Sequence, residues 1–126
     1  MDKIQVIAEG PKNVPYSGAL YAGGFIYISG QVPLDELKQV VGEDIETQNT
    51  YTLEKIEDLL TKAGAHLSDV VKTTVFLIDM KNFSRMNEAY SKKFKEPFPC
   101  RSCIEVNELP APVMIEIDAI AYFPRK

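Results

Sequence analysis

The chain lacks the features that mark several large classes of protein. None of its apolar runs approaches the roughly 18 residues that a membrane-spanning helix needs, and Met1-Asp2-Lys3-Ile4 does not resemble a signal peptide. The 126 residues contain no internal repeat and no linker long enough to divide them. We therefore expect one domain, residues 1–126, that is cytoplasmic and makes no membrane contact, with a targeting sequence outside this chain left open.

An excess of positive charge is also absent. The chain has 14 Lys and Arg against 18 Asp and Glu, a net charge of −4. Proteins that bind the backbone of nucleic acids concentrate basic residues into a stripe. The densest basic run here, Lys92-Lys93 with Lys95, is flanked by Glu88 and Glu96 and is typical of a solvated helix end. We therefore expect no nucleic-acid partner.

Metal-ligating residues are too few for a structural metal site. Cys100 and Cys103 form a C-x-x-C pair, but a redox pair needs a helix N-terminus that lowers a thiol pKa, whereas this pair enters a strand. Zinc needs four ligands, and His66, the single histidine of the chain, is the one other obvious donor. The sequence therefore predicts neither a metal nor a redox function.

What the chain does contain is a regular succession of strand and helix patterns. Alternating and β-branched runs predict strands at 4–8, 19–22, 25–29, 70–78, 99–106 and 114–119. Gly23 and Gly24 separate two of these runs and suit the positive φ angles of a two-residue hairpin loop. The sequence therefore predicts a sheet of about six strands with a hairpin near its start.

Two helices interrupt these strands. The first is predicted from Asp44, as N-cap, to Ala63, with Gly64 as the C′ glycine. Asp79 or Asn82 caps the second, which ends before two prolines, and its inward stripe contains Phe83, Met86, Tyr90 and Phe94, with Asn87 on the same stripe. An amide on such a stripe is either a satisfied hydrogen-bonding group or part of a site. The predicted fold class is α+β.

The alternation also predicts which side chains share a face of the sheet. The fourth strand is apolar on both faces, Val71, Val75 and Leu77 opposing Val70, Phe76 and Ile78. In the last strand, Val113, Ile115, Ile117, Ala119 and Ala121 form the core face, and Glu116 and Asp118 point the other way. A strand that is apolar on both faces is covered on both faces.

Two helices are not enough to cover both faces. A helix is about 10 Å across and six strands about 4.8 Å apart span roughly 25 Å, so the helices cover one face. A second copy of the chain is the simplest cover for the other. We expect Arg101, Cys103, Glu116 and Asp118 on this second face, either as a solvated ion-pair surface or as a cleft at a seam between subunits.

Six segments together resemble the reactive intermediate deaminase family (RidA/YjgF). They occur in order along nearly the whole chain: Pro15-Tyr16-Ser17, Ser29-Gly30-Gln31-Val32-Pro33, Val70-Val71-Lys72-Thr73-Thr74-Val75, Asn87-Glu88-Ala89-Tyr90, Pro99-Cys100-Arg101-Ser102 and Ile115-Glu116-Ile117-Asp118-Ala119. The resemblance implies the chorismate-mutase-like fold and a homotrimer with three clefts between subunits. It also implies hydrolysis of reactive enamines and imines such as 2-aminoacrylate to 2-oxo acids and ammonia, which is a form of metabolite damage control that needs no cofactor.

The resemblance also implies roles for individual residues. Arg101 would bind the substrate carboxylate, because a guanidinium is a permanently charged, two-pronged donor. Glu116 would orient or activate the attacking water as base or acid. The backbone at Cys103 would hold the substrate nitrogen or the oxygen that replaces it. Tyr16 and Ser29 would close the cleft and bond the substrate, and Asn87 would be a supporting residue of the substrate-binding site.

The chain departs from the family pattern at three places. Gly18 stands where a larger polar side chain is common, which would widen the cleft and leaves the substrate size open. Cys100 replaces a small alanine before the arginine, and the 36–39 connection lacks the usual Pro and Gly. Two other functions stay open: a non-catalytic sensor of small 2-oxo acids, for which Arg101 would serve equally, and a ribonuclease-type translation inhibitor, as some similar proteins have been described.

Overall fold

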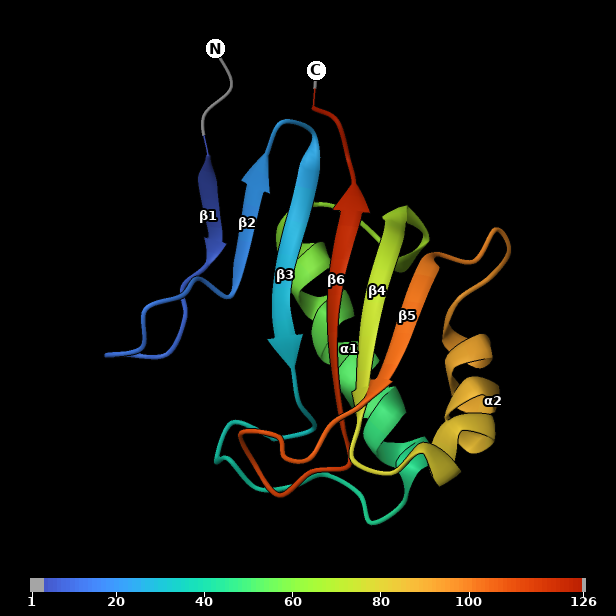
Figure 1. Ribbon diagram of the computed structural model, residues 1–126. Helices are drawn as coiled ribbons and strands as arrows, with labels where there is room; N and C mark the ends of the chain where they lie inside the picture. The colour runs from blue at the N-terminus through green and yellow to red at the C-terminus, as the bar shows by residue number, and fades with distance from the viewer. Residues whose placement is uncertain (1–3, 126) are drawn as a thin grey trace.

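The computed structural model of the protein describes residues 4–125. It contains six strands, two α-helices and two short 3₁₀ turns (Figure 1): β1 Gln5–Ala8, β2 Ala19–Ala22, β3 Phe25–Gln31, α1 Ile45–Lys62, η1 Leu67–Asp69, β4 Val70–Leu77, η2 Met80–Asn82, α2 Phe83–Lys93, β5 Cys100–Glu105 and β6 Ile115–Tyr122. This order confirms the predicted α+β class. None of the helices described is long and apolar enough to cross a membrane.

The six strands form one mixed sheet in the order β1-β2-β3-β6-β4-β5. Neighbours are antiparallel except for β4 and β5, which run parallel because α2 makes the crossover between them. Helix α1 lies behind the middle of the sheet in the view of Figure 1, and α2 lies beside α1 near the β5 edge. The helices therefore cover one face, as predicted, and within the described residues no helix covers the other.

Local sequence signals set the element boundaries. The Asp44 carboxylate caps α1 by accepting a hydrogen bond from the Thr47 N–H at 2.7 Å. Gly64 follows α1 with φ +86°, a conformation that suits a residue without a Cβ. Asp79 begins η2 by accepting from the Lys81 N–H at 2.9 Å, whereas Asn82 makes no side-chain cap bond. Asp79 is thus the effective cap of the turn that leads into α2.

The core lies between the helices and the sheet. It is built mainly of aliphatic side chains that are fully or almost fully buried, among them Ile26, Ile45, Leu53, Ile56, Leu60, Val75, Leu77, Met86, Ile115 and Ile117. Gln48 ties α1 to the surrounding chain, because its amide donates to the Gly42 carbonyl at 3.0 Å and accepts from the Met114 N–H at 2.8 Å. These bonds fix the approach to β6, which carries Glu116.

Asn49 is a buried polar group that the core does not satisfy. Its side chain is fully buried in α1, and neither amide atom has a hydrogen-bond partner among the described residues. Thr52, one turn later, shows the alternative: its hydroxyl donates to the Gln48 carbonyl at 2.8 Å. Threonine has nearly the volume of asparagine, so it can occupy this position and bond to its own helix.

We therefore expect Asn49→Thr to stabilise the protein. Removing an unsatisfied buried amide should raise the free energy of unfolding by about 1–2 kcal/mol in urea denaturation. Asn107→Thr, at an exposed loop position, is the matched control and should change stability by less than about 0.5 kcal/mol. A lower stability of Asn49→Thr would contradict this account and would mean that a buried water satisfies the amide.

The predicted faces of Val70 and Val71, at the start of β4, were wrong. Val70 is buried in the core and Val71 is 43% exposed, the reverse of the prediction. The pairing of β4 with β6 shifts register between Val70 and Lys72, which is a bulge that turns one residue to the other face. From Lys72 onward the predicted alternation of β4 holds, with Val75 and Leu77 buried on the helix face.

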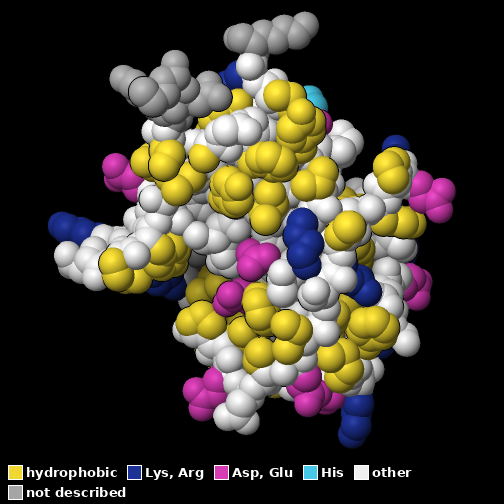
Figure 2. All heavy atoms as spheres, turned by 45° about the horizontal axis from the view of Figure 1, so that its top comes forward, with side chains coloured by type: hydrophobic (Ala, Val, Ile, Leu, Met, Phe, Trp, Pro, Cys, Tyr) yellow, Lys and Arg dark blue, Asp and Glu magenta, His cyan; other side chains and the backbone are white. Residues whose placement is uncertain are grey.

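The sheet face opposite the helices, called here the open face, is rich in apolar side chains. The strand registers place on it Val6, Leu20, Ala22, Phe25, Tyr27, Lys72, Thr74, Phe76, Cys100, Ser102, Ile104, Glu116, Asp118, Ile120 and Tyr122. Tyr27, Ile104 and Tyr122 are 45%, 46% and 51% exposed. Figure 2 shows hydrophobic side chains gathered over this surface, with charged groups near its middle. Such a patch is typical of an interface.

Candidate active site

Arg101 and Cys103 lie on the helix face of the sheet. In the parallel ladder Arg101 is opposite Thr73 and Cys103 is opposite Val75, and both partners are fully buried beneath the helices. The prediction that they share the second face with Glu116 and Asp118 was therefore wrong. Alternation shows which residues of one strand share a face, but the register with the neighbouring strand decides which face that is.

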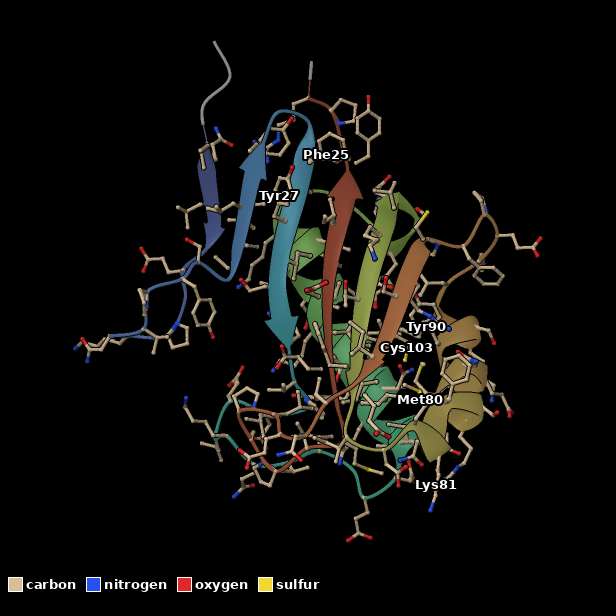
Figure 3. All side chains as sticks on the ribbon, in the orientation of Figure 1. Phe25, Tyr27, Met80, Lys81, Tyr90 and Cys103 are labelled. Atoms are coloured by element: carbon tan, nitrogen blue, oxygen red, sulfur yellow. The ribbon has the colours of Figure 1, made fainter. Side chains whose placement is uncertain are left out.

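Arg101 has a seat made of aromatic rings and a thioether. Its guanidinium carbon lies over the ring of Phe83, 5.5 Å from the centroid, and over the ring of Tyr90 at 5.0 Å. One Nη donates to the Met86 sulfur at 3.9 Å. Figure 3 shows Tyr90, on α2, near the β5 edge of the sheet where Cys103 is labelled. The seat holds the cation by attraction to ring faces, and apart from the contact with Met86 its N–H groups have no hydrogen-bond acceptor among residues 4–125.

No carboxylate among residues 4–125 forms an ion pair with Arg101. The ion pairs within residues 4–125 are Arg85 with Glu46, Lys92 with Glu88 and Lys93 with Glu57. A half-buried guanidinium without a counter-ion is an anion-binding group. Its fork of parallel donors matches a carboxylate.

Cys103 and Asn87, two other predicted site residues, lie on the same side of the sheet as Arg101. Burial raises the pKa of the Cys103 thiol, and the Arg101 charge opposes this effect only in part. The thiol is therefore protonated at neutral pH and is a poor nucleophile. β5 is an edge strand, so backbone groups on its outer side have no strand partner and can bind a ligand. Asn87, on α2, has a buried Oδ1 without a partner among the described residues.

Glu116 lies on the open face, opposite Phe76 in the antiparallel ladder of β4 and β6. Burial, and secondarily the charge of Asp118, raises the pKa of its carboxyl. The carboxylate accepts no hydrogen bond from residues 4–125, but it lies against the backbone of Gly30, where an added Cβ would come within 2.2 Å of Oε2. Gly30 leaves room for the Glu116 carboxylate, whose pKa burial raises above its usual value.

A cavity of about 620 Å³ borders Glu116. Its lining includes Tyr16, Gly18, Gly30 and Lys55, but not Arg101, Cys103 or Asn87. Of the predicted site residues, the structure thus brings Tyr16 and Glu116 together. Gly18 is tightly enclosed, because an added Cβ would lie 3.1 Å from the Glu9 carbonyl. A larger side chain at this position would require the N-terminal segment to move.

Ser29, on β3, does not line this cavity, but it hydrogen-bonds to the segment that does. Its hydroxyl donates to the Ser17 carbonyl at 2.6 Å, and its N–H donates to the Gly18 carbonyl at 3.0 Å. Both bonds anchor the segment that carries Tyr16. The hydroxyl oxygen keeps acceptor capacity, so direct substrate contact by Ser29 stays a prediction.

Sequence reasoning missed the groups that support the charged residues. Phe83 and Tyr90 were assigned to a core stripe, and their contact with Arg101 depends on how α2 packs against β5. Lys55 was not singled out, yet its ammonium donates to the Val32 and Leu34 carbonyls at 2.7 and 3.0 Å beside the cavity, and burial lowers its pKa. The signal for Lys55 was weak, because a lysine on a helix is ordinarily solvated.

The charged groups therefore form two candidate half-sites on opposite faces of the sheet. The first is Arg101 with its seat, Cys103 and Asn87. The second is Glu116 with the cavity that Tyr16 lines. The half-sites lie on opposite faces, and β4 separates β5 from β6. One small molecule therefore cannot contact both half-sites of the same chain. Among residues 4–125, no group of three or more His, Cys, Asp or Glu is placed to hold a metal ion.

Known proteins share this fold along nearly the whole chain. The family model described as endoribonuclease L-PSP matches residues 8–123. A RutC family protein of Pyrococcus abyssi is 47% identical over 114 residues, covering 89% of this chain and 90% of that protein. The crystal structure of the YjgF gene product of E. coli has a TM-score of 0.84 and 36% identity, covering 96% of this chain and 99% of the other.

One relative has a name that states an activity. A protein of Salmonella typhimurium, named 2-iminobutanoate/2-iminopropanoate deaminase, is 41% identical over 110 residues, covering 85% of this chain and 86% of that protein. A solved structure called RidA, from an Antarctic Psychrobacter, has a TM-score of 0.84 and 33% identity over 98% of this chain and all of that one. In sequence and in fold, the chain belongs to the RidA/YjgF family, also called L-PSP or RutC.

Proposed function

We propose that the protein is a hydrolytic deaminase of reactive enamines and imines such as 2-aminoacrylate. The enamine tautomerises to 2-iminopropanoate, and water adds to the carbon of the C=N bond. The resulting carbinolamine then expels ammonia and leaves a 2-oxo acid. The Salmonella relative, 41% identical and named for this activity, supports the proposal. The observation that carries it is the Arg101 guanidinium, seated on aromatic rings with no counter-ion among the described residues.

Each half-site has a part in this reaction. Arg101 binds the carboxylate of the imino acid in two-pronged fashion and fixes the imine carbon. A backbone group at Cys103 bonds the nitrogen or the incoming oxygen. Glu116, whose pKa is raised by burial, passes protons between water, carbinolamine and departing ammonia. Tyr16 and Ser29 close the other wall, and Asn87 supports the Arg101 side.

We infer that the working form is a closed trimer whose clefts lie between subunits. The open face is rich in apolar side chains and no helix of residues 4–125 covers it, so self-association would bury it. In each cleft the Arg101 half-site of one copy would meet the Glu116 half-site of the next. A small substrate can then contact both groups, which a single sheet holds apart.

The trimer predicts a mass in solution about three times the 14.1 kDa of one chain. Ile120→Asp places a charge in the middle of the open face, between Tyr27 and Lys72 in the ladder, and should give monomers in sedimentation equilibrium. Leu37→Asp, at a loop position that is 78% exposed, is the control and should remain trimeric. A wild-type monomer at micromolar concentration would contradict the assembly.

The function is tested by coupling the protein to a dehydratase that releases 2-aminoacrylate from serine. Formation of pyruvate should accelerate in proportion to added wild-type protein, and Arg101→Ala should give only the spontaneous rate. Equal rates with and without the wild-type protein would refute the deaminase. Pyruvate binding without acceleration would leave the protein as a non-catalytic binder of 2-oxo acids.

The family model's description favours a second candidate, an endoribonuclease. The net charge of −4 weighs against it, because RNA binding depends on concentrated positive charge. A filter-binding assay with single-stranded RNA at low salt decides between the two. Salt-sensitive binding and cleavage would support the ribonuclease, and absence of binding would dismiss it.

A further inference from the structure

We propose that Tyr90, held by a hydrogen bond to Thr73, is a positioning residue for Arg101. Its ring orients the Arg101 guanidinium and thereby sets the affinity of the site for a carboxylate. This inference rests on the proposed function, because it concerns the same cation. It assigns a role to two residues that would otherwise belong to the core.

Tyr90 and Phe83 contribute unequally to the seat. The Tyr90 ring lies closer to the guanidinium, at 5.0 Å against 5.5 Å for Phe83. Tyr90 is also 5% exposed, whereas Phe83 is only partly buried at the start of α2. A cation–π contact strengthens as water is excluded from it. The Tyr90 ring is therefore the stronger and more rigid support.

A hydrogen bond fixes the ring itself. The Tyr90 hydroxyl and the Thr73 hydroxyl lie 2.7 Å apart, and both residues are buried. Phe94 packs on Tyr90 with 4.7 Å between ring centroids. Burial raises the pKa of the Tyr90 phenol, so the ring is neutral and does not form an ion pair with the arginine. The bond to Thr73 therefore holds the Tyr90 ring over the guanidinium.

Arg101, Thr73 and Tyr90 form a closed set of three pairwise contacts. Thr73 is the residue directly opposite Arg101 in the β4–β5 ladder. The parallel pairing sets Arg101 beside Thr73, the hydroxyl bond joins Thr73 to Tyr90, and the Tyr90 ring contacts the guanidinium. The long arginine side chain is thereby ordered before substrate arrives, which reduces the entropy lost on binding. An anchoring carboxylate would order it too, but would occupy its donors and cancel its charge.

The test measures binding of pyruvate to the full-length protein by calorimetry at low salt. Tyr90→Leu should weaken binding about tenfold, because the ring face is lost. Tyr90→Phe and Thr73→Val keep the ring and each remove the hydroxyl bond, and each should weaken binding about threefold. Because both remove the same bond, the double variant should bind no more weakly than either single variant.

Phe94→Leu is the matched control, since it removes a buried ring that packs on Tyr90 without contacting Arg101. It should lower stability yet leave pyruvate affinity within about twofold of wild type. A spectroscopic readout is also available, because the chain has 6 Tyr and no Trp. Pyruvate should perturb near-ultraviolet tyrosine absorption in the wild type, and the perturbation should be smaller in Tyr90→Phe, where Tyr16 is the remaining tyrosine of the cleft.

The outcomes separate this inference from the proposed function. Wild-type affinity in Tyr90→Leu, equal weakening in Phe94→Leu, additive effects of the two hydroxyl variants, or no pyruvate binding by the wild type would each overturn the positioning role. Pyruvate binding that follows the predicted order in a protein without deaminase activity would support it and refute the deaminase alone.

Discussion

Replacing Arg101 with lysine should lower kcat/KM for 2-iminopropanoate by about 10- to 100-fold, and replacing it with alanine by about 10²- to 10³-fold. Lysine keeps the charge but loses the second parallel hydrogen bond and the planar contact with the Phe83 and Tyr90 rings. Alanine loses the charge as well. Both losses should appear chiefly in KM, because a carboxylate contact forms equally in the ground and transition states.

Arg85→Lys is the matched control for this series. Arg85 forms an exposed ion pair with Glu46 at 2.6 Å and touches neither half-site, so its conservative replacement should leave kcat/KM within about twofold of wild type. Full activity of Arg101→Lys would show that two-pronged carboxylate recognition is wrong. An equal loss in both lysine variants would point to a general effect on the fold.

Replacing Glu116 with glutamine should lower kcat by about 10²- to 10⁴-fold with little change in KM, as expected when a proton-transfer group is removed without altering its shape. Circular dichroism should show an unchanged fold, because the amide fits the same space beside Gly30. Activity of Glu116→Gln within tenfold of wild type would mean that another group moves the protons.

The pH profile identifies the form in which Glu116 acts. Its pKa is raised above the ordinary value of 4.5, first by burial and then by Asp118. A raised carboxyl pKa extends the protonated form to higher pH, so a general base would give activity that rises through this pKa and a general acid activity that falls. Asp118→Asn removes the repulsion and should move this limb to lower pH. A limb that does not move in Asp118→Asn would not belong to Glu116.

Much of the fold was predictable because it depends on local patterns. Asp44 and Gly64 predicted the ends of α1, which the structure confirms. The expectation that two helices cover only one face of the sheet is also confirmed, and the open face is rich in apolar side chains. Periodicity and capping act within a few residues of the chain, so a single sequence records them.

The face on which Arg101 lies was not predictable in this way. Arg101 and Cys103 alternate with exposed Ser102 and Ile104 on an edge strand, and neither set is buried enough to identify the core side. The parallel register with β4, which sets Arg101 opposite Thr73, decides the question. The bulge after Val70 is a similar case, because a register shift leaves no mark in a run of β-branched residues.

The supports of the two half-sites were hidden for another reason. Tyr90 and Phe94 fit a core stripe whether or not a cation lies over one of the rings. Gly30 fits a strand end whether or not Glu116 needs the space. Such roles arise where elements distant in sequence meet, and only the packing of α2 on β5 and of β3 on β6 reveals them.

Arg101 and Glu116 lie on opposite faces of the sheet, so the proposed reaction would depend on assembly. If the reaction needs both groups, the substrate must lie between two copies of the chain. Two inactive variants should then complement each other. In a shared cleft, Arg101→Ala supplies an intact Glu116 and Glu116→Gln supplies an intact Arg101.

The most direct test mixes Arg101→Ala with Glu116→Gln in equal amounts, dissociates the mixture and lets it reassemble. With random assembly about one cleft in four contains both native groups, so the mixture should recover about a quarter of wild-type activity. Each variant treated alone should stay inactive. Activity in the reassembled mixture no higher than in the separate variants would contradict a site shared between neighbouring copies.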